Sequence, residues 1–372
     1  MGETISLFQR FPGLEGRLPR VPLGSFPTPV EPLRVPGAAR EVWVKRDDLT
    51  GRAYGGNKVR KLEFLLADAR EKGTERVITA GALGSHHALA TTVYARQLGF
   101  PVTLVLSPQR PTPHVREVLL ADHALGAELR LARRMELIPW GLFMARVRNL
   151  GSRPYVVPPG GSDGIGSLGY VNAALELVQQ VEAGELPMPR EVHVACGTMG
   201  TVAGLALGFA LADAPIRVNG IRVVSSLVTN LRALRKLLRA TAALLRSAGV
   251  EAPSVEASLE RVRLRHDQFG DGYGKATHEG RRAMERLGSA DFHLDATYTA
   301  KAAAGLLAAL DEGMPGPHLY WHTLSHGMPP LPESGSGASA IGSLPPEFRS
   351  FLQAEWGGGT RAEGGKPGPT GV

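Results

Sequence analysis

Short runs of apolar residues alternate along this chain with longer amphipathic stretches, and this alternation restricts the fold more than any other feature. Strands are expected at residues 42–44, 76–80, 101–106, 155–157, 192–195, 218–224 and 319–321. Helical patterns fall at residues 58–72, 85–98, 115–125, 166–181, 201–211, 231–245, 277–287 and 300–310. Strands that alternate with helices form βαβ units, so the sequence predicts an α/β fold with a mostly parallel sheet. Ligands of such folds bind at the carboxyl ends of the strands.

Length and composition place the chain among ordinary globular proteins. Its 372 residues are enough for two domains, at roughly 150 residues per domain. Cys196 is the only cysteine, so an internal disulfide and a cysteine-based zinc cage are both excluded. We find no apolar run long enough to cross a membrane and no secretory pattern in the first 13 residues. We therefore expect a cytoplasmic protein with no membrane partner.

The charge is basic but spread along the chain. The net charge is +7, and most of the positive charge is arginine. No zinc finger, RNA-recognition signature or basic run with interleaved aromatic residues accompanies it, so we expect no nucleic-acid partner. Glycine and proline dominate the end of the chain, which predicts a disordered tail over residues 346–372.

Two glycine-rich segments imitate nucleotide-binding motifs. Residues 164–169 spell G-x-G-x-x-G, but the next predicted strand ends without the acidic residue that would hold a ribose hydroxyl. A tight turn that leads into a helix is therefore favoured over a nicotinamide site. Gly51 and Gly56 have the spacing of a P-loop, but Asn57 precedes the lysine and Val59 follows it, which excludes a Walker A motif.

A third glycine-rich segment is a better phosphate site. It follows a predicted buried strand and opens an apolar helix, and it consists of Gly197, Thr198, Met199, Gly200 and Thr201. Small residues let backbone amides form an anion nest at a helix N-terminus, although an ordinary strand–turn–helix corner is the alternative. The segment has no lysine, so we expect a monophosphate bound by neutral donors.

A monophosphate cofactor together with one separate lysine is the requirement of pyridoxal phosphate, which forms a Schiff base. The candidate is Lys58, because Gly55 and Gly56 before it allow the backbone to approach a ligand closely. The alternative is a solvated lysine at the start of a helix.

Two segments around this lysine carry a resemblance to a known family. Residues 45–49 (KRDDL) and 55–63 (GGNKVRKLE) resemble the 1-aminocyclopropane-1-carboxylate deaminase and D-cysteine desulfhydrase family. The resemblance extends from about Phe26 to Thr323. It implies a fold type II, tryptophan synthase β-like enzyme with two open, twisted, mostly parallel sheets flanked by helices. The large cofactor-binding domain would comprise residues 1–61 with 162–345, and residues 62–161 would form a small inserted domain.

The resemblance also implies the roles of individual residues. Lys58 would hold pyridoxal phosphate and then act as acid and base at the substrate Cα, with Asn57 before it as in the family. Residues 197–201 match the phosphate loop, usually Gly-Ser-Gly-Gly-Thr. Thr323 matches the residue that faces the pyridine nitrogen. The family is homodimeric, so we expect a homodimer.

The substrate side of the site is implied in the same way. Ser85, His86 and His87 align with the loop that grips the substrate carboxylate, and Ser85 is placed to act in catalysis. His86 replaces a family asparagine that contacts the phenolic oxygen of the cofactor. Tyr298 matches the active-site tyrosine. No metal site is expected near His322 or His326.

The resemblance favours elimination from a small amino acid. A threonine facing the pyridine nitrogen gives a weak electron sink, which suits β-elimination. Thr299 follows the tyrosine as in the desulfhydrase branch, whereas the deaminase branch has glutamate. We therefore expect a D-cysteine desulfhydrase-like lyase that yields pyruvate, ammonia and sulfide. Ring opening of 1-aminocyclopropane-1-carboxylate is the alternative, and so is an inert cofactor-binding relative, because His86, Met199 and Leu324 depart from the family pattern.

Overall fold

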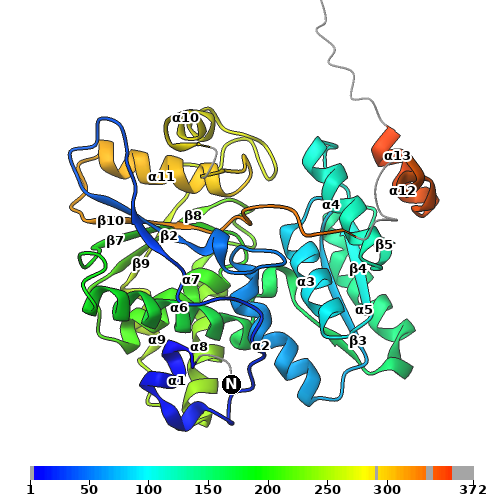
Figure 1. The fold of residues 1–372 in the computed structure, drawn as a ribbon, viewed down its shortest axis with the longest axis horizontal. Helices are drawn as coiled ribbons and strands as arrows, with labels where there is room; N and C mark the ends of the chain where they lie inside the picture. Colours follow the sequence, from blue (N-terminus) through cyan, green and yellow to red (C-terminus); the bar gives the residue numbers. More distant parts are fainter. Residues whose placement is uncertain (1–3, 290–291, 332–337, 354–372) are drawn as a thin grey trace, which may run out of the picture.

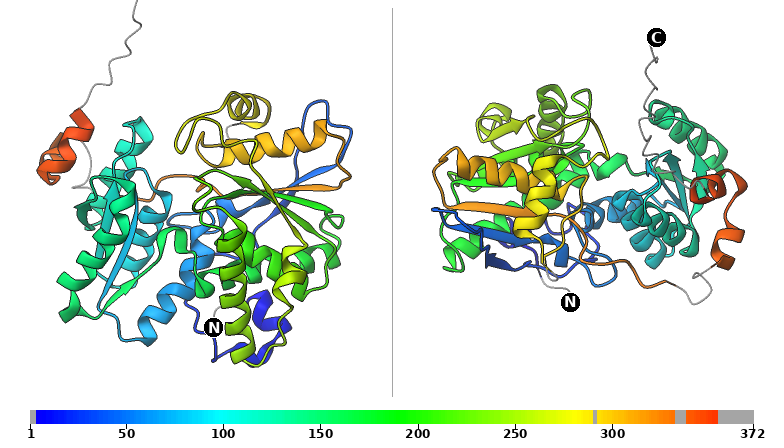
Figure 2. Two further views of the ribbon diagram at one scale, coloured as in Figure 1. Left: turned by 180° about the vertical axis from the view of Figure 1, so that it is seen from behind. Right: turned by 90° about the horizontal axis from the view of Figure 1, so that it is seen from above.

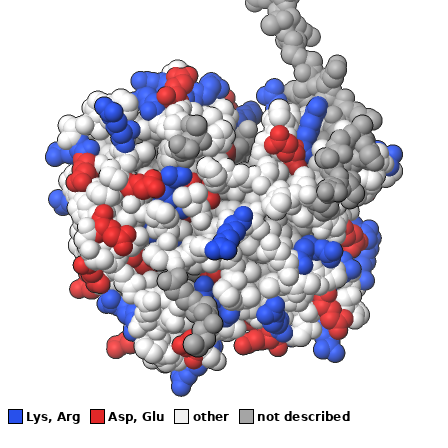
Figure 3. All heavy atoms as spheres, in the orientation of Figure 1, with Lys and Arg blue, Asp and Glu red and all other residues white. Residues whose placement is uncertain are grey.

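The computed structural model describes residues 4–289, 292–331 and 338–353, and these residues form two α/β units, each built around its own sheet (Figure 1). Both sheets are mostly parallel, and helices flank them (Figure 2). The predicted fold class is therefore confirmed. None of the helices within these residues combines the length and apolarity needed to cross a bilayer. On the face drawn in Figure 3, basic side chains lie scattered among acidic ones.

The larger sheet has six strands, all parallel except for one antiparallel pair at the edge, β1 with β2. Their order is β1 (Val30–Pro32), β2 (Val42–Arg46), β10 (His318–His322), β7 (Glu191–Cys196), β8 (Arg217–Arg222) and β9 (Val262–Arg265). Helices α10 (His278–Leu287) and α11 (Thr299–Asp311) lie on one side of this sheet. Helices α6 (Gly164–Glu182), α7 (Gly200–Leu211), α8 (Leu231–Ser247) and α9 (Val255–Leu259) lie on the other side.

The smaller sheet is wholly parallel. Its order is β5 (Glu128–Leu131), β4 (Val102–Ser107), β3 (Arg76–Ala82) and β6 (Pro154–Val156). Successive residues of β3 point to opposite faces. Val77 accordingly packs with α3 (His86–Gln97) and α4 (Pro113–Ala124), and Ile78 packs with α5 (Ile138–Arg148).

Short elements complete the chain. The N-terminal arm contains α1 (Ser6–Arg10), whose Leu7 is buried in the core of the large unit. The 3-10 helices are η1 (Pro12–Leu14), η2 (Asp47–Leu49), η3 (Met135–Leu137), η4 (Leu150–Ser152) and η5 (Pro159–Gly161).

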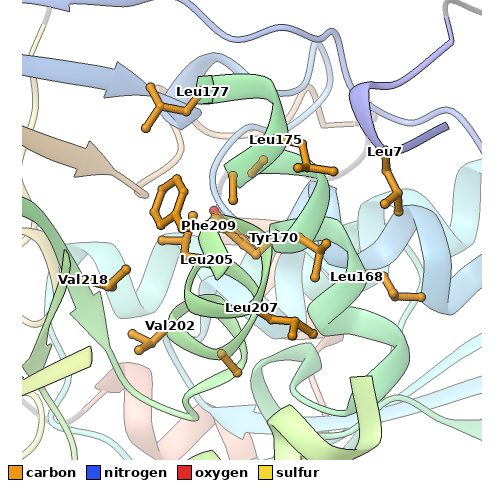
Figure 4. Close-up of a cluster of buried hydrophobic side chains, with 14 of the residues drawn as sticks. Leu7, Leu168, Tyr170, Leu175, Leu177, Val202, Leu205, Leu207, Phe209 and Val218 are labelled. Atoms are coloured by element: carbon orange, nitrogen blue, oxygen red, sulfur yellow. The ribbon is translucent and has the colours of Figure 1, made fainter. Parts of the chain in front are cut away.

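The core of the large unit forms where α6 and α7 pack against each other and against the sheet (Figure 4). Leu168 and Tyr170 from α6 meet Leu205 and Phe209 from α7 in this core. The glycines of the G-x-G-x-x-G segment lie in the first turns of α6. A Cβ at Gly169 would lie 2.1 Å from the carbonyl oxygen of Arg60 on α2 (Lys58–Glu71), so this glycine allows two helices to approach closely.

A buried ionic network joins four elements of the large unit. The Arg60 guanidinium of α2 lies 2.7 Å from Asp47 of η2 and 2.8 Å from Glu176 of α6. Lys45 of β2 lies 2.7 Å from the same Glu176 carboxylate. Burial alone would raise the pKa of Glu176, but Arg60 and Lys45 outweigh it and lower the pKa to about 2. The Glu176 carboxylate is therefore held charged in the interior.

The end of the chain departs from the prediction. After β10 the chain crosses from the large unit to the small one and ends there in α12 (Ala338–Ser343) and α13 (Pro346–Gln353) (Figure 2). Leu344 and Phe348 are fully buried in the core of the small unit. The predicted tail at 346–372 thus begins with an ordered helix, α13, whose Phe348 packs into this core together with the preceding Leu344. Residues 354–372 lie outside the described part of the chain.

Replacing Arg60 with alanine tests the buried network. The substitution leaves Asp47 and Glu176 without their shared cation, and we expect a loss of about 3–5 kcal/mol in the free energy of unfolding. Urea unfolding followed by circular dichroism measures it. Arg130→Ala is the matched control, because Arg130 pairs with Glu128 at the surface and should cost less than about 1 kcal/mol. Equal losses in the two variants would contradict a structural role for the network.

Candidate active site

Lys58 is the first residue of α2, and two glycines set its position. A Cβ at Gly55 would lie 2.0 Å from the carbonyl oxygen of Asp48. A Cβ at Gly56 would lie 2.9 Å from that of Thr323, and Gly56 also has a φ of 87°. The loop therefore passes between η2 and the segment after β10 where no side chain fits. The backbone amide of Asn57 donates to Thr323 O at 3.1 Å, which ties the start of α2 to the end of β10.

The amine of Lys58 is set up to react. Its side chain is half-buried, and the described residues give its ammonium no hydrogen-bond or ion-pair partner. Burial lowers the pKa of Lys58 to about 8, because removal from water penalises the charged form. A substantial fraction of this amine is therefore neutral near physiological pH, unlike that of an exposed lysine.

The predicted anion nest, residues 197–201, joins the carboxyl end of β7 to the start of α7. The backbone amides of residues 197–199 have no hydrogen-bond acceptor among the described residues. They are therefore available to donate to an anion. The amide of Gly200 donates to Ser162 Oγ at 3.3 Å, and that hydroxyl lies 2.7 Å from Thr198 Oγ1. Asn57 Nδ2 donates to Thr201 Oγ1 at 3.4 Å, so the nest adjoins the Lys58 loop.

Met199 replaces a glycine of the family loop without filling the nest. Its φ is 71°, in the left-handed region that glycine normally occupies. Its side chain is buried in the core of the large unit, with Sδ 3.3 Å from the thiol of Cys196. Burial raises the pKa of that thiol to about 12, so Cys196 stays protonated, as expected of a small buried hydrophobe.

Lys61 is a functional candidate that the sequence analysis missed. Its buried ammonium lies 3.0 Å from Gly160 O and 3.2 Å from Ser162 Oγ, and a Cβ at Gly200 would lie 3.0 Å from Lys61 Nζ. The sequence analysis expected neutral donors alone, and this lysine adds a cationic candidate beside them. Burial and the charge of Lys58 hold the pKa of Lys61 well below its usual value, and a bound anion would relieve both effects. The available signal was spacing, because residues three apart share one face of a helix.

The N-terminus of α3 carries the three residues predicted to bind substrate. Ser85 Oγ accepts from the amide of Ala88 at 3.3 Å as the N-cap. His87 turns into the small unit, where Nε2 lies 2.9 Å from Thr79 Oγ1. His86 lies 2.5 Å from the hydroxyl of Tyr54 through Nδ1. Burial, with a smaller contribution from the charge on Lys58, lowers the pKa of both histidines.

Tyr298 is positioned by the turn that opens α11. Asp295 accepts from the amides of Thr297 at 2.9 Å and Tyr298 at 2.8 Å. The Tyr298 hydroxyl lies 2.6 Å from that of Tyr273. Burial raises the pKa of Tyr298 well above its usual value, so the phenol keeps its proton and has one hydrogen bond to donate. Thr299 donates through its hydroxyl to Asp295 at 2.7 Å and is buried.

The segment after β10 replaces the Gly-Gly of the family with Leu324-Ser325. Leu324 is buried, and Ser325 Oγ accepts from the amide of Gly55 at 3.0 Å. The serine thereby holds the loop that presents Lys58. Thr323, predicted to face the pyridine nitrogen, is buried beside this loop.

Asp47 and Asp48 each form an ion pair, Asp47 with Arg60 and Asp48 with Arg46. They are therefore not a free carboxylate pair.

Taken together, the geometry joins a reactive amine to an anion nest. Lys58 and Lys61 lie one turn apart on α2, and Lys61 reaches the nest through Ser162. No three His, Cys, Asp or Glu residues gather in a possible metal site within the described ranges. The residues present suit a ligand that carries a phosphate at one end and a group able to react with an amine at the other.

Comparison with known proteins agrees with this geometry. A family model described as "Pyridoxal-phosphate dependent enzyme" matches residues 21–322. The nocardicin C-9' epimerase of Nocardia uniformis subsp. tsuyamanensis is 36% identical over 352 residues, 91% of this chain and 100% of the relative. A D-cysteine desulfhydrase of Klebsiella pneumoniae (strain 342) is 36% identical over 319 residues, 82% and 94% of the two chains.

A solved structure matches at the level of the fold as well. The crystal structure of an ACC deaminase homologue has a TM-score of 0.71 and 36% sequence identity, and the match covers 84% of this chain and 93% of the other. The sequence resemblance is thereby confirmed.

The lowered pKa of Lys58 can be measured without any cofactor. We expect its reactivity toward trace acetic anhydride, read by mass spectrometry of peptides, to rise with pH and level off above about pH 9, because the neutral amine is the nucleophile. Lys72, at the exposed C-terminal end of the same helix, serves as the control. Parallel pH profiles for the two lysines would contradict the effect of burial.

Proposed function

The chain belongs to the pyridoxal-phosphate-dependent enzyme family, and we propose that it eliminates the β-substituent of a small amino acid, as a D-cysteine desulfhydrase does. From D-cysteine the products would be pyruvate, ammonia and sulfide. The observation that carries the proposal is the unpartnered, half-buried amine of Lys58 beside an anion nest served by Lys61. Lyase chemistry in this family starts from such an amine.

The residues present fit pyridoxal phosphate. The amides of residues 197–199 and the ammonium of Lys61 would hold the phosphate, whose negative charge suits the start of α7 and a buried cation. Lys58 would hold the cofactor covalently, and Thr323 would face the pyridine nitrogen. When bound, pyridoxal phosphate draws electrons from the substrate Cα and so makes its proton acidic.

Residues of the chain itself transfer the proton, hold the substrate carboxylate and assist the leaving substituent. Lys58 takes the proton from Cα, since an amine of pKa about 8 can both accept and return a proton near neutral pH. Ser85 and the amides at the start of α3 hold the substrate carboxylate. Tyr298, which keeps its proton, donates a hydrogen bond toward the leaving substituent. The Cα–H and the Cβ–S bonds break, sulfide leaves with the bonding electrons, and water later releases pyruvate and ammonia.

Thr299 favours elimination over cyclopropane opening. It stands where the deaminase branch has glutamate, and its hydroxyl is committed to Asp295 at 2.7 Å. The position therefore offers neither a carboxylate nor a free hydroxyl to the site. A homodimer in the cytoplasm, implied by the resemblance and by the cysteine content, remains part of the proposal.

Removing the Lys58 amine tests the proposed function directly. We expect the purified protein to show a visible absorption band with pyridoxal phosphate, to respond to D-cysteine and to release pyruvate. Lys58→Ala should lose covalent attachment and lower turnover by more than about 1000-fold, because it removes both the attachment point and the base. The measurements are the absorption spectrum, borohydride trapping with mass spectrometry, and a coupled pyruvate assay.

Other outcomes separate the alternatives. Turnover of 1-aminocyclopropane-1-carboxylate without D-cysteine turnover would contradict the elimination proposal and favour ring opening. Exchange of the Cα proton with solvent but no pyruvate would favour an epimerase, the activity named for the Nocardia relative. A bound cofactor that responds to no amino acid would favour an inert relative.

Neutralising Lys61 tests its role at the phosphate. We expect Lys61→Met to weaken binding of pyridoxal phosphate by about 10- to 100-fold, the value of one charge-assisted hydrogen bond. Equilibrium dialysis of the apoprotein measures the dissociation constant. Lys72→Met, at the exposed end of α2, is the control and should bind as the parent does. Unchanged affinity in Lys61→Met would assign that lysine to packing alone.

A further inference from the structure

His86 has a hydrogen-bond partner that the family resemblance does not supply. The hydroxyl of Tyr54 lies 2.5 Å from His86 Nδ1. Tyr54 belongs to the loop that leads into Lys58, and its side chain is only 3% exposed. Among the described residues, the Tyr54 hydroxyl has no other hydrogen-bond partner. The loop that presents the lysine is thus joined directly to the N-terminus of α3.

The position of the shared proton follows from these contacts. A phenol has one proton to donate, and burial raises the pKa of Tyr54, so the phenol keeps that proton. If Nδ1 of His86 carried a proton as well, the buried Tyr54 proton would have no acceptor, at a cost of about 1–3 kcal/mol. The favoured arrangement is therefore Tyr54 O–H donating to Nδ1, which leaves the imidazole proton on Nε2.

The surroundings keep this imidazole neutral. The ring of His114, from the start of α4, lies with its centroid 4.6 Å from that of His86 and an interplanar angle of 30°. Burial and the neighbouring charges of His114 and Lys58 together outweigh the opposing charge of Asp295 and lower the pKa of His86 to about 4. At neutral pH the ring is thus a single-proton donor, not a cation.

We propose that Tyr54 is a positioning residue that fixes His86 in the Nε2–H tautomer, so that His86 presents an N–H donor where the family has an asparagine amide. An imidazole exchanges its proton between two nitrogens, whereas an amide N–H is fixed by its chemistry. A histidine can therefore take over the donor role only with a neighbour that occupies Nδ1. The identity of the acceptor, the phenolic oxygen of the bound cofactor, rests on the proposed function, but the tautomer does not.

The tautomer can be read by nitrogen NMR of the full chain labelled with ¹⁵N-histidine, first without and then with pyridoxal phosphate. The ring nitrogens of His86 are assigned by their loss in His86→Asn. We expect one Nε2–H species in the parent protein, with no protonation of His86 down to about pH 5. In Tyr54→Phe we expect an Nδ1–H population and a rise of about 0.5–1 unit in the pKa of His86, the effect of losing one hydrogen bond to the neutral ring.

A matched variant separates the loss of the Tyr54–His86 hydrogen bond from the loss of any other tyrosine hydroxyl. Tyr155→Phe removes another largely buried hydroxyl, which donates to Asp68 at 2.7 Å, and should leave the His86 signals unchanged. An Nδ1–H species in the parent protein would overturn the proposal. So would an unchanged tautomer and an unchanged pKa in Tyr54→Phe. Both results can be read without turnover of any substrate, so failure here differs from failure of the proposed function.

A double variant gives a second, independent readout. The amide of His86→Asn has a fixed N–H donor, so that variant does not depend on Tyr54 to select a tautomer. We therefore expect Tyr54→Phe to weaken cofactor binding several-fold in the parent chain but to have no further effect in the His86→Asn background. Equal weakening in both backgrounds would contradict coupling through the imidazole and overturn the positioning role.

Discussion

The buried charges around Arg60 fix the geometry on which the rest of the structure depends. Arg60 is two residues beyond Lys58, and its guanidinium bonds Asp47 of η2 and Glu176 of α6 in the interior. Trp321 of β10 and Tyr170 of α6 each donate to the same Asp47 oxygen at 2.7 Å. A buried ion pair gives little net stability over apolar packing, but its directional bonds permit few arrangements. Here they hold the start of α2 in one place relative to the large sheet.

This anchoring explains how the start of α2 can carry two lysines with different roles. Lys58 provides a reactive amine, and Lys61 provides a buried cation beside the nest. Gly55 and Gly56 bring the backbone close to η2 and to Thr323, so the amine of Lys58 leaves the surface and its pKa falls to about 8. One turn later, Lys61 points to Ser162 and the nest at the start of α7. An ammonium buried so close to another cation is unfavourable without an anion. A phosphate bound at the nest, as proposed, would complete this charge arrangement.

The sequence predicted the longer strands and most of the longer helices, and it missed short edge strands and a helix without a polar face. All seven expected strands and all eight expected helices occur, with shifts of a few residues at their ends. Strands β5 and β9 were missed because they are short edge strands in which charged and apolar residues alternate. Helix α5 was missed because apolar residues surround it and Gly141 interrupts it. The motif around Lys58 was predictable from local sequence, whereas the contacts of Lys61 with Ser162 and of Tyr54 with His86 join residues distant in sequence.

The departures from the family pattern have local explanations that bear on whether the site can work. Met199 adopts a glycine-like φ and places its side chain in the core, so the nest keeps its shape. Ser325 returns a hydroxyl to the Gly55 amide, so the substituted turn still holds the lysine loop. His86 has the phenol of Tyr54 against one ring nitrogen. Each substitution therefore comes with a neighbour that compensates for it. The departures from the family pattern are therefore accommodated locally and do not by themselves argue against a cofactor site.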